Sequence, residues 1–342
     1  MTSSPDAPVG SASPLLKVVG LRTVFPVSGG REAAAVDGVS FEIGRGETLG
    51  LVGESGSGKS VTALSIIRLV MPPGRLVAGR IELEGRNLMD LGEEDMRRVR
   101  GRRIGFVFQE PMVALNPVYT IGFQIRETLL VHGLARGAAA KRRALELLEA
   151  VRVPDPARRV REYPHQLSGG LRQRAMIALA LAAEPSLLIA DEPTTALDVT
   201  VQAEVLDLLR DMRRAFGLSL LLITHDLGIV AEMADRVAVM YCGRIVEQAS
   251  VSRLFGAPAH PYTKGLLASI PAGQSGERLV SIPGTVPALG QIGAGCAFEP
   301  RCVERFAPCA ASPPDESMVA VGPPRHDVRC YLNSPAKTGG KQ

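Results

Sequence analysis

The pattern of apolar and polar residues divides the chain into a long body and two short tails. Residues 1–14 and 334–342 are rich in small and polar residues and show no period, so we expect both tails to lack regular structure. Between them, short β-rich runs over residues 16–43 lead to TLGLVG (48–53), a nearly all-apolar run. Such a run is typical of a strand that is buried on both faces of a sheet.

Apolar helical and strand segments alternate after this strand. Strands are predicted at 104–108, 186–190, 218–224 and 236–241, and helices after Gly58, across 121–151, and at 168–183 and 200–216. This alternation favours an α/β domain around a largely parallel sheet. After about Phe255 the composition shifts to Pro, Gly and Cys. We therefore place the α/β domain at 15–256 and a smaller, loop-rich unit at 257–333.

Composition and charge narrow the setting without deciding the function. With 342 residues, 46% of them apolar and 22% charged, the chain can bury a substantial core. Five cysteines and an N-terminus without a signal-peptide pattern favour a reducing, cytoplasmic setting. The longest apolar run, 175–183, is much shorter than the roughly 20 residues that cross a bilayer. The net charge is +4, and we interpret the Arg-rich run at 96–103 as a solvated helix face rather than a nucleic-acid site.

The stretch GESGSGKS (53–60) fits the phosphate-loop pattern G-x-x-x-x-G-K-[ST], and it lies between a predicted strand and a predicted helix. Glycines let the backbone N–H groups turn inward around an anion. A lysine at a helix N-terminus opposes the helix dipole unless a phosphate lies there, and the following serine is placed to bind Mg²⁺. We assign nucleotide binding to Gly53, Glu54, Ser55, Gly56, Ser57, Gly58, Lys59, Ser60 and Val61.

Two carboxylates and a histidine follow apolar strands farther along the chain. Asp191 and Glu192 end the run SLLIADE, and His225 ends LLLITH. We predict that Asp191 holds Mg²⁺, that Glu192 acts as the general base on the attacking water, and that His225 contacts the γ-phosphate. Ligands collect at the carboxyl ends of parallel strands, which favours these roles over structural ones.

A second predicted anion site lies in LSGGLRQR (167–174). Ser168 is a good helix N-cap, and Gly169 and Gly170 leave the first helical N–H groups uncovered. One chain therefore has two phosphate-binding helix ends but a single set of Mg²⁺ ligands. We therefore expect the second helix end to bind the phosphates of a nucleotide that is held by a partner chain.

These motifs in this order resemble the nucleotide-binding subunit of ATP-binding cassette (ABC) transporters over about residues 15–255. The resemblance implies a P-loop ATPase fold with a parallel-sheet core, an antiparallel β subdomain and a helical subdomain. It also implies that two cassettes enclose two ATP molecules head to tail. By resemblance, Gln109 contacts Mg²⁺ and the attacking water, and Asp198 couples the two sites. Phe25 is the aromatic residue best placed to stack on adenine, because only Phe25 and Phe41 precede the phosphate loop. The family's usual signature glutamine is Leu171 here, which we interpret as a subfamily feature.

The segments QEPMVALNPVYTIGFQI (109–125) and HPYTKGLLASIP (260–271) resemble the dipeptide, oligopeptide and nickel importer cassettes. The resemblance implies ATP-driven import of peptides at the cytoplasmic face of a membrane. The expected partners are a second, similar cassette, two membrane permease subunits and an extracytoplasmic substrate-binding protein, with no nucleic acid. A nickel importer cassette and a soluble ABC ATPase acting on DNA or ribosomes remain the alternatives, and the sequence does not reveal the cargo.

Four cysteines cluster in the last fifty residues: Cys296, Cys302, Cys309 and Cys330. In some of the peptide-importer cassettes that this chain resembles, four such cysteines hold a [4Fe–4S] cluster. The resemblance implies such a cluster here, with a structural or redox-sensing role. A Cys₄ zinc site and unliganded thiols are the alternatives, whereas disulfides are disfavoured in a cytosolic chain. The expected cofactors are thus ATP, Mg²⁺ and a [4Fe–4S] cluster, with Zn²⁺ as the alternative to the cluster.

Overall fold

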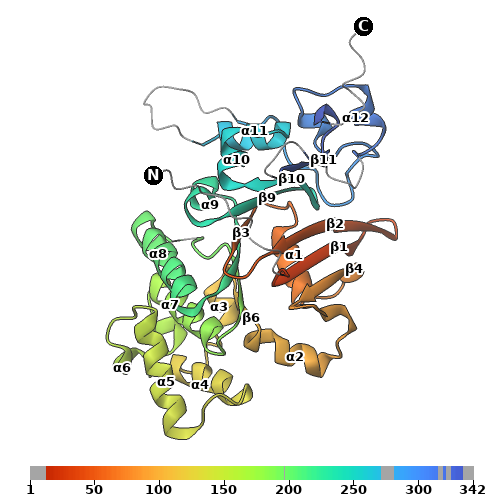
Figure 1. The fold of residues 1–342 in the computed structure, drawn as a ribbon. Coiled ribbons are helices and arrows are strands. Elements are labelled where there is room, and N and C mark those ends of the chain that lie inside the picture. The colour runs from red at the N-terminus through yellow and green to blue at the C-terminus, as the bar shows by residue number, and fades with distance from the viewer. Residues whose placement is uncertain (1–12, 196, 271–280, 315–318, 321–324, 334–342) are drawn as a thin grey trace, which may run out of the picture.

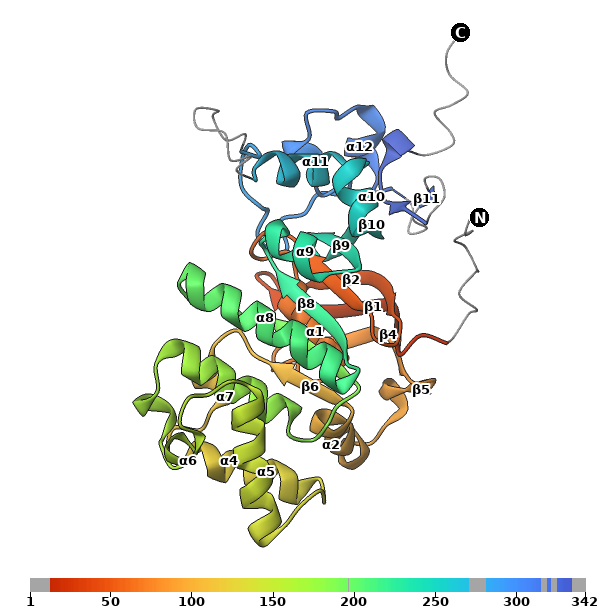
Figure 2. The same ribbon diagram turned by 60° about the vertical axis from the view of Figure 1, so that its left-hand side comes forward.

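The computed structural model describes residues 13–195, 197–270, 281–314, 319–320 and 325–333 (Figure 1). Both predicted tails lie almost entirely outside these residues. Two sheets lie in the middle of the molecule, a group of helices lies at one end, and the C-terminal elements lie at the other (Figures 1 and 2). The predicted α/β cassette fold is confirmed.

The larger sheet has the strand order β11-β12-β10-β9-β3-β8-β7-β6, and its five strands from β9 to β6 are parallel. Each of these five strands was predicted from its apolar run, with ends that differ by at most two residues. Their bounds are β9 Arg236–Tyr241, β3 Thr48–Val52, β8 Ser219–Thr224, β7 Leu187–Asp191 and β6 Ile104–Val107. Every residue of β3, β7 and β8 is buried, as expected for strands covered on both faces.

The smaller sheet is antiparallel and comes mainly from the N-terminal β-rich runs. Its order is β2-β1-β4-β5, and its bounds are β2 Arg31–Ile43, β1 Leu16–Val27, β4 Arg75–Leu83 and β5 Arg86–Asn87. This sheet and helix α1 (Lys59–Ile66) pack on one face of the parallel sheet.

Alternate side chains of the parallel strands belong to two different cores. Leu187 and Ile189 of β7 pack in the core that includes the antiparallel sheet, whereas Leu188 and Ala190 pack in the core with the helices. This period of two follows from the alternation of side chains along a strand. The helices of the second core are α4 Ile121–Val131, α5 Gly137–Ala150, α7 Gly169–Leu181 and α8 Val199–Phe216.

The remaining helices are short. They are α2 Glu93–Arg102, α3 Pro111–Ala114, α6 Pro156–Arg159, α9 Leu227–Met233, α10 Val251–Gly256, α11 Pro261–Ala268 and α12 Ala307–Ala311. Helix α2 contains most of the Arg-rich run. Its Arg97 and Arg98 side chains are 67% and 73% exposed and lie within ion-pair distance of Glu94. The predicted solvated helix face is therefore confirmed for Arg97 and Arg98, whereas the Arg100 side chain is only 18% exposed and donates to the Ile67 and Arg68 carbonyl oxygens.

The C-terminal region is joined to the main sheet more closely than its loop-rich composition indicated. Strand β12 (Asp327–Val328) pairs with β10 (Arg244–Ser250), and β11 (Val319–Ala320) pairs with β12. Beside this pairing, the buried side chains of His326 and Glu247 form a hydrogen bond of 2.6 Å. These strands extend the parallel sheet at its β9 edge. The region is thus anchored by backbone pairing as well as by side-chain contacts.

Candidate nucleotide-binding site

The phosphate loop connects the carboxyl end of β3 to α1, as predicted. Two of its glycines are required by close backbone approaches. A Cβ atom on Gly53 would lie 2.2 Å from the Met240 carbonyl oxygen, and one on Gly58 would lie 2.3 Å from the Ala35 carbonyl oxygen. Both residues also have positive φ angles, 156° and 103°. The loop can therefore wrap tightly only with glycine at these positions.

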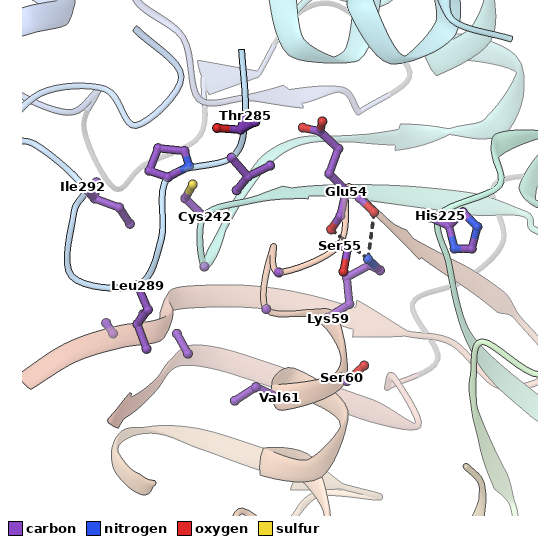
Figure 3. Close-up of a pocket in the computed structure, with 18 of the residues that line it drawn as sticks. Glu54, Ser55, Lys59, Ser60, Val61, His225, Cys242, Thr285, Leu289 and Ile292 are labelled. Carbon is purple, nitrogen blue, oxygen red and sulfur yellow. Dashed lines mark hydrogen bonds between the residues drawn. The ribbon is translucent and has the colours of Figure 1, made fainter. Parts of the chain in front are cut away.

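Lys59 lies buried inside this loop. Its ammonium donates to the carbonyl oxygens of Gly53 and Glu54, at 2.7 and 3.0 Å (Figure 3). Burial lowers the pKa of Lys59, while the nearby charges of Glu192, Asp191 and Glu54 oppose that shift. A buried cation at the N-terminus of a helix, surrounded by a glycine-rich backbone, is suited to binding phosphate.

Ser60 and Asp191 are brought together from α1 and the end of β7. The Ser60 hydroxyl donates to Asp191 Oδ1 at 3.0 Å. Burial raises the pKa of the Asp191 carboxyl, an effect that the Ser60 hydrogen bond opposes and the charge of Glu192 reinforces. A hydroxyl paired with a buried carboxylate beside a phosphate loop has the donor chemistry that Mg²⁺ requires.

Glu192 is held by three polar side chains from three segments. Its Oε2 accepts hydrogen bonds from Gln109 Nε2 at 3.2 Å and from the Thr195 hydroxyl at 2.9 Å. Its Oε1 lies 3.3 Å from His225 Nδ1. The backbone of Glu192 has a φ of 46°, a left-handed conformation that is uncommon outside glycine and is often found at functional sites. The structure thus brings together three residues that the sequence assigned to catalysis.

A cavity of about 880 Å³ opens above these residues. Figure 3 shows Glu54, Ser55, Lys59 and Ser60 between His225 on one side and Leu289 and Ile292 on the other. The predicted site residues that line the cavity are Gly53, Glu54, Ser55, Gly56, Gly58, Lys59, Ser60, Val61, Gln109, Glu192 and His225. Ser57 is a fully buried residue of the loop, and Asp191 is connected to the site by its hydrogen bond with Ser60.

The signature residues lie elsewhere on the same chain. Ser168 caps α7 by accepting from Leu171 N, and Asp198 caps α8 by accepting from Val201 N. Ser168, Gly169 and Asp198 are exposed. Gly170 permits a close approach between the two helices, since a Cβ there would lie 2.7 Å from Val201. None of these residues is among the described residues that line the cavity.

Phe25 also lies away from the described lining of the cavity. Its ring packs against Gly74, where an added Cβ would lie 2.5 Å from the nearest ring carbon. The roles assigned to Phe25 and to the signature residues stay predictions.

The sequence did not indicate several residues that contact or line the site. Arg301 donates to both carboxylate oxygens of Glu54, and the Tyr262 hydroxyl accepts from Glu54 N at 2.9 Å. A C-terminal segment, residues 284–292, also forms part of the cavity wall. Tyr262 and Arg301 fall within segments that the sequence marked for other reasons, namely the HPYTKG element and the cysteine cluster. No local pattern connected them to the phosphate loop.

The four clustered cysteines line one small cavity of about 20 Å³. Burial raises the pKa of the Cys296, Cys302 and Cys330 thiols, the last to about 11. Cys296 N donates to the Cys309 carbonyl oxygen at 2.8 Å, which ties two of the four together. Among the residues that the structure describes, no group of three or more His, Cys, Asp or Glu side chains is arranged to hold a metal ion.

The fold and the site together define a P-loop nucleoside triphosphatase, with acidic residues at the end of a strand near the phosphate loop. The family described as "ABC transporter" matches residues 36–195, and the family described as "Oligopeptide/dipeptide transporter, C-terminal region" matches residues 246–309. The chain belongs to the ABC transporter family and is an ATPase of the cassette type. The resemblance predicted from the motifs is therefore confirmed.

Two relatives from Bacillus subtilis are similar over most of their lengths. The oligopeptide transport ATP-binding protein AppD is 50% identical over 94% of this chain and 97% of its own. The oligopeptide transport ATP-binding protein OppD is 53% identical over 84% of this chain and 81% of its own. A solved dimeric structure of an ATP-binding cassette in a post-hydrolysis state, bound to ADP and Pi, has a TM-score of 0.62. That cassette is 28% identical, and the match covers 69% of this chain and 98% of the cassette.

No helix in the described part of this chain is both long and apolar enough to span a membrane.

Proposed function

We propose that this chain is the ATP-hydrolysing subunit of an importer for di- or oligopeptides. The relatives of similar length are named for oligopeptide transport, which supports this cargo class over nickel. The observation that carries the ATP-hydrolysing part of the proposal is the position of Glu192, held by Gln109, Thr195 and His225 at the cavity of the phosphate loop. The import part rests on the matched C-terminal family and on these relatives.

The residues around the cavity fit ATP and Mg²⁺. Gly53 and Gly58 form a cradle that a Cβ atom would fill, and Lys59 supplies its buried positive charge. Ser60 and Asp191 would hold Mg²⁺, with Gln109 nearby at the end of β6. When bound, the cation neutralises charge on the phosphate oxygens.

Glu192 would remove the proton from the attacking water. The amide of Gln109 and the hydroxyl of Thr195 both donate to Glu192 Oε2 and leave Oε1 beside His225. This arrangement fixes the Glu192 carboxylate in one orientation. A general base needs such a fixed orientation to take a proton from the attacking water. The His225 side chain is 62% exposed and can therefore reach a γ-phosphate or a partner chain without rearranging the core.

The signature segment would act across a dimer. Ser168 and Gly169 are exposed at the N-terminus of α7, a 13-residue helix, and lie outside the cavity of their own chain. Such a helix end can bind the phosphates of a second chain. The dimeric state of the solved relative supports this arrangement. In the proposed complex a second, homologous cassette completes both sites, with Asp198 at the interface.

The remaining partners follow from the importer assignment. We propose that the chain works with two membrane permease subunits and an extracytoplasmic substrate-binding protein, from a peripheral position on the cytoplasmic face of the membrane. The ATPase domain is proposed to cover residues 15–256 and the peptide-importer-type C-terminal domain residues 257–333. The match of the C-terminal family to residues 246–309 supports a boundary in this region.

The four cysteines are proposed to hold a [4Fe–4S] cluster, with zinc as the alternative. The support is chemical, since Cys296, Cys302, Cys309 and Cys330 line one cavity and four thiolates are the ligands that such clusters use. The cavity is only about 20 Å³, so the thiols would have to move apart around a cluster or draw together around an ion. The role of the bound cluster would be structural or redox-sensing.

Reconstitution with the membrane subunits in proteoliposomes tests the proposed function. We expect peptide uptake that depends on ATP and on the binding protein. Glu192→Gln should retain ATP binding but reduce hydrolysis by about 10²- to 10⁴-fold, the usual contribution of a general base. Glu149→Gln, on the exposed face of α5, is the matched control and should behave as the wild type.

Other results would redirect the assignment. Uptake of nickel without peptide would favour the nickel importer. Co-purification with DNA or ribosomes in place of permeases would favour a soluble ATPase. Near-normal hydrolysis by Glu192→Gln would remove Glu192 from the role of general base.

A further inference from the structure

One wall of the nucleotide cavity comes from the C-terminal region. We call residues 284–292 the C-terminal arm. Its Thr285, Val286, Pro287, Leu289 and Ile292 line the same cavity as the phosphate loop. The arm follows the phosphate loop by more than 220 positions in the sequence, yet it closes the cavity on the side away from His225 (Figure 3).

The cavity is chemically divided. Lys59, Ser60, Gln109, Glu192 and His225 form its polar side, where the triphosphate is proposed to lie. Leu289 and Ile292 lie on the side opposite His225 (Figure 3), and the other apolar residues of the lining include Ala34, Ala35, Val61, Leu266 and Val286. A nucleotide has the same division, because its phosphates are charged and its base is flat and mostly apolar.

The arm is fixed in place from two directions. Arg301 Nε donates to the Pro283 carbonyl oxygen at 2.9 Å, at the start of the arm. Farther along, Gly290 has a φ of 87° and lies against Val27 of β1, so that an added Cβ would come within 3.3 Å of that side chain. The arm is thereby held against the end of the antiparallel sheet. A wall held in this way can be preformed before a nucleotide binds.

Leu289 and Ile292 keep apolar surface available to a ligand. Their exposed fractions are 40% and 37%, although they lie beside a cavity rather than on an open face. Phe25, the aromatic residue expected to meet the base, packs its ring against Gly74 and is outside the described lining. Leu266 of α11 also lines the cavity, but among the large apolar side chains of the lining those of Leu289 and Ile292 in the arm are the exposed ones.

We propose that Leu289 and Ile292 of the C-terminal arm form the surface against which the base of ATP lies. The C-terminal region then completes the nucleotide site of its own chain. This inference rests on the proposed ATP-binding function and adds two binding residues to it. Burying apolar surface of the two side chains against the base stabilises the bound nucleotide.

Two ligands distinguish a base-binding surface from a general effect on the site. Tripolyphosphate has the phosphates of ATP without its base, so it reports the phosphate loop alone. In the full-length protein, Leu289→Ser/Ile292→Ser should weaken ATP binding about tenfold or more and leave Mg²⁺–tripolyphosphate binding unchanged. Val303→Ser is the matched control, because Val303 is an apolar residue of the same region that is 87% exposed and lies outside the cavity lining.

Isothermal titration of both ligands with the wild type and each variant gives a decisive result. Selective loss of ATP affinity, with the control unchanged, supports the proposal. Unchanged ATP affinity, or equal weakening of both ligands, would overturn it while leaving the proposed function intact. Failure of the wild type to bind either ligand would instead overturn the proposed function and this inference together.

Discussion

Arg301 and Glu54 form a bidentate ion pair across 247 positions of the sequence. Arg301 Nη1 lies 2.7 Å from Glu54 Oε2, and Nη2 lies 3.0 Å from Oε1. The Arg301 side chain is only 5% exposed and lies near the rings of Tyr241 and Phe298. Glu54 is the second residue of the phosphate loop, and Arg301 directly precedes Cys302. The pair therefore links the cysteine region to the nucleotide site.

This ion pair is expected to support ATP binding by neutralising a carboxylate beside the phosphates. Arg301→Met would leave the charge of Glu54 unpaired, so we expect ATP affinity to fall about tenfold. Adding Glu54→Gln to this variant should recover most of the loss, because it removes the uncompensated charge. Titration of ATP into the single and double variants measures both effects. If Arg301→Met had a lower melting temperature but bound ATP normally, the Arg301–Glu54 pair would have only a structural role.

The main elements and half of the site could be predicted because their signals are local. The strands β3, β7 and β8 are continuous apolar runs, and the motif residues follow directly at their carboxyl ends. Parallel pairing then brings Lys59, Asp191 and Glu192 together without further information. For this reason the predicted catalytic side chains do meet in the structure.

The other half of the site depends on contacts between residues far apart in the sequence, and no short sequence pattern indicates such contacts. Tyr262 is 208 positions from Glu54, and the C-terminal arm is a Pro/Gly-containing loop without a periodic pattern. The position of the arm depends on the hydrogen bond from Arg301 to Pro283 and on the approach of Gly290 to Val27, which composition alone did not indicate. The assignment of adenine stacking to Phe25 rested on its position before the phosphate loop, and that position does not determine where the ring points.

The glycines of the phosphate loop should differ in their tolerance of substitution. Gly58→Ala would place a Cβ 2.3 Å from the Ala35 carbonyl oxygen, so the loop must shift and nucleotide binding should be lost. At Gly56, with φ of 79°, a Cβ would meet no atom within 4 Å. Gly56→Ala should cost only about 1–2 kcal/mol of backbone strain. ATP binding and melting temperature of the two variants test this difference, and equal effects would contradict it.

His260 is expected to make the folded protein sensitive to acid. Burial, with a smaller effect of Lys264, lowers the pKa of His260 to about 3, and its Nδ1 accepts from Tyr262 N at 3.0 Å. In the unfolded chain the pKa returns to about 6.5, so the unfolded state binds a proton that the folded state does not. The free energy of unfolding should therefore fall as the pH falls from about 6.5 toward about 3.

Denaturation midpoints measured across this pH range give the slope. His260→Gln cannot bind that proton and should show a flatter dependence on pH, whatever its stability at neutral pH. His165→Gln is the control, since His165 is exposed, and it should keep the wild-type slope. Identical slopes for the wild type and His260→Gln would remove His260 as the cause.

The cysteine cluster gives the last prediction. Protein purified without oxygen should be brown and contain about four iron atoms per chain, as four thiolates saturate a [4Fe–4S] cluster. Cys302→Ser should lose the colour and the iron. Because Arg301 directly precedes Cys302, the ATP affinity of the Cys302→Ser variant should also fall toward that of Arg301→Met.

Cys242→Ser is the matched control for the cysteine cluster. Cys242 lines the nucleotide cavity rather than the cysteine cavity, so this variant should stay brown. Colourless protein with one zinc per chain would favour the Cys₄ zinc site. Metal-free protein with an ordered C-terminal region would contradict both.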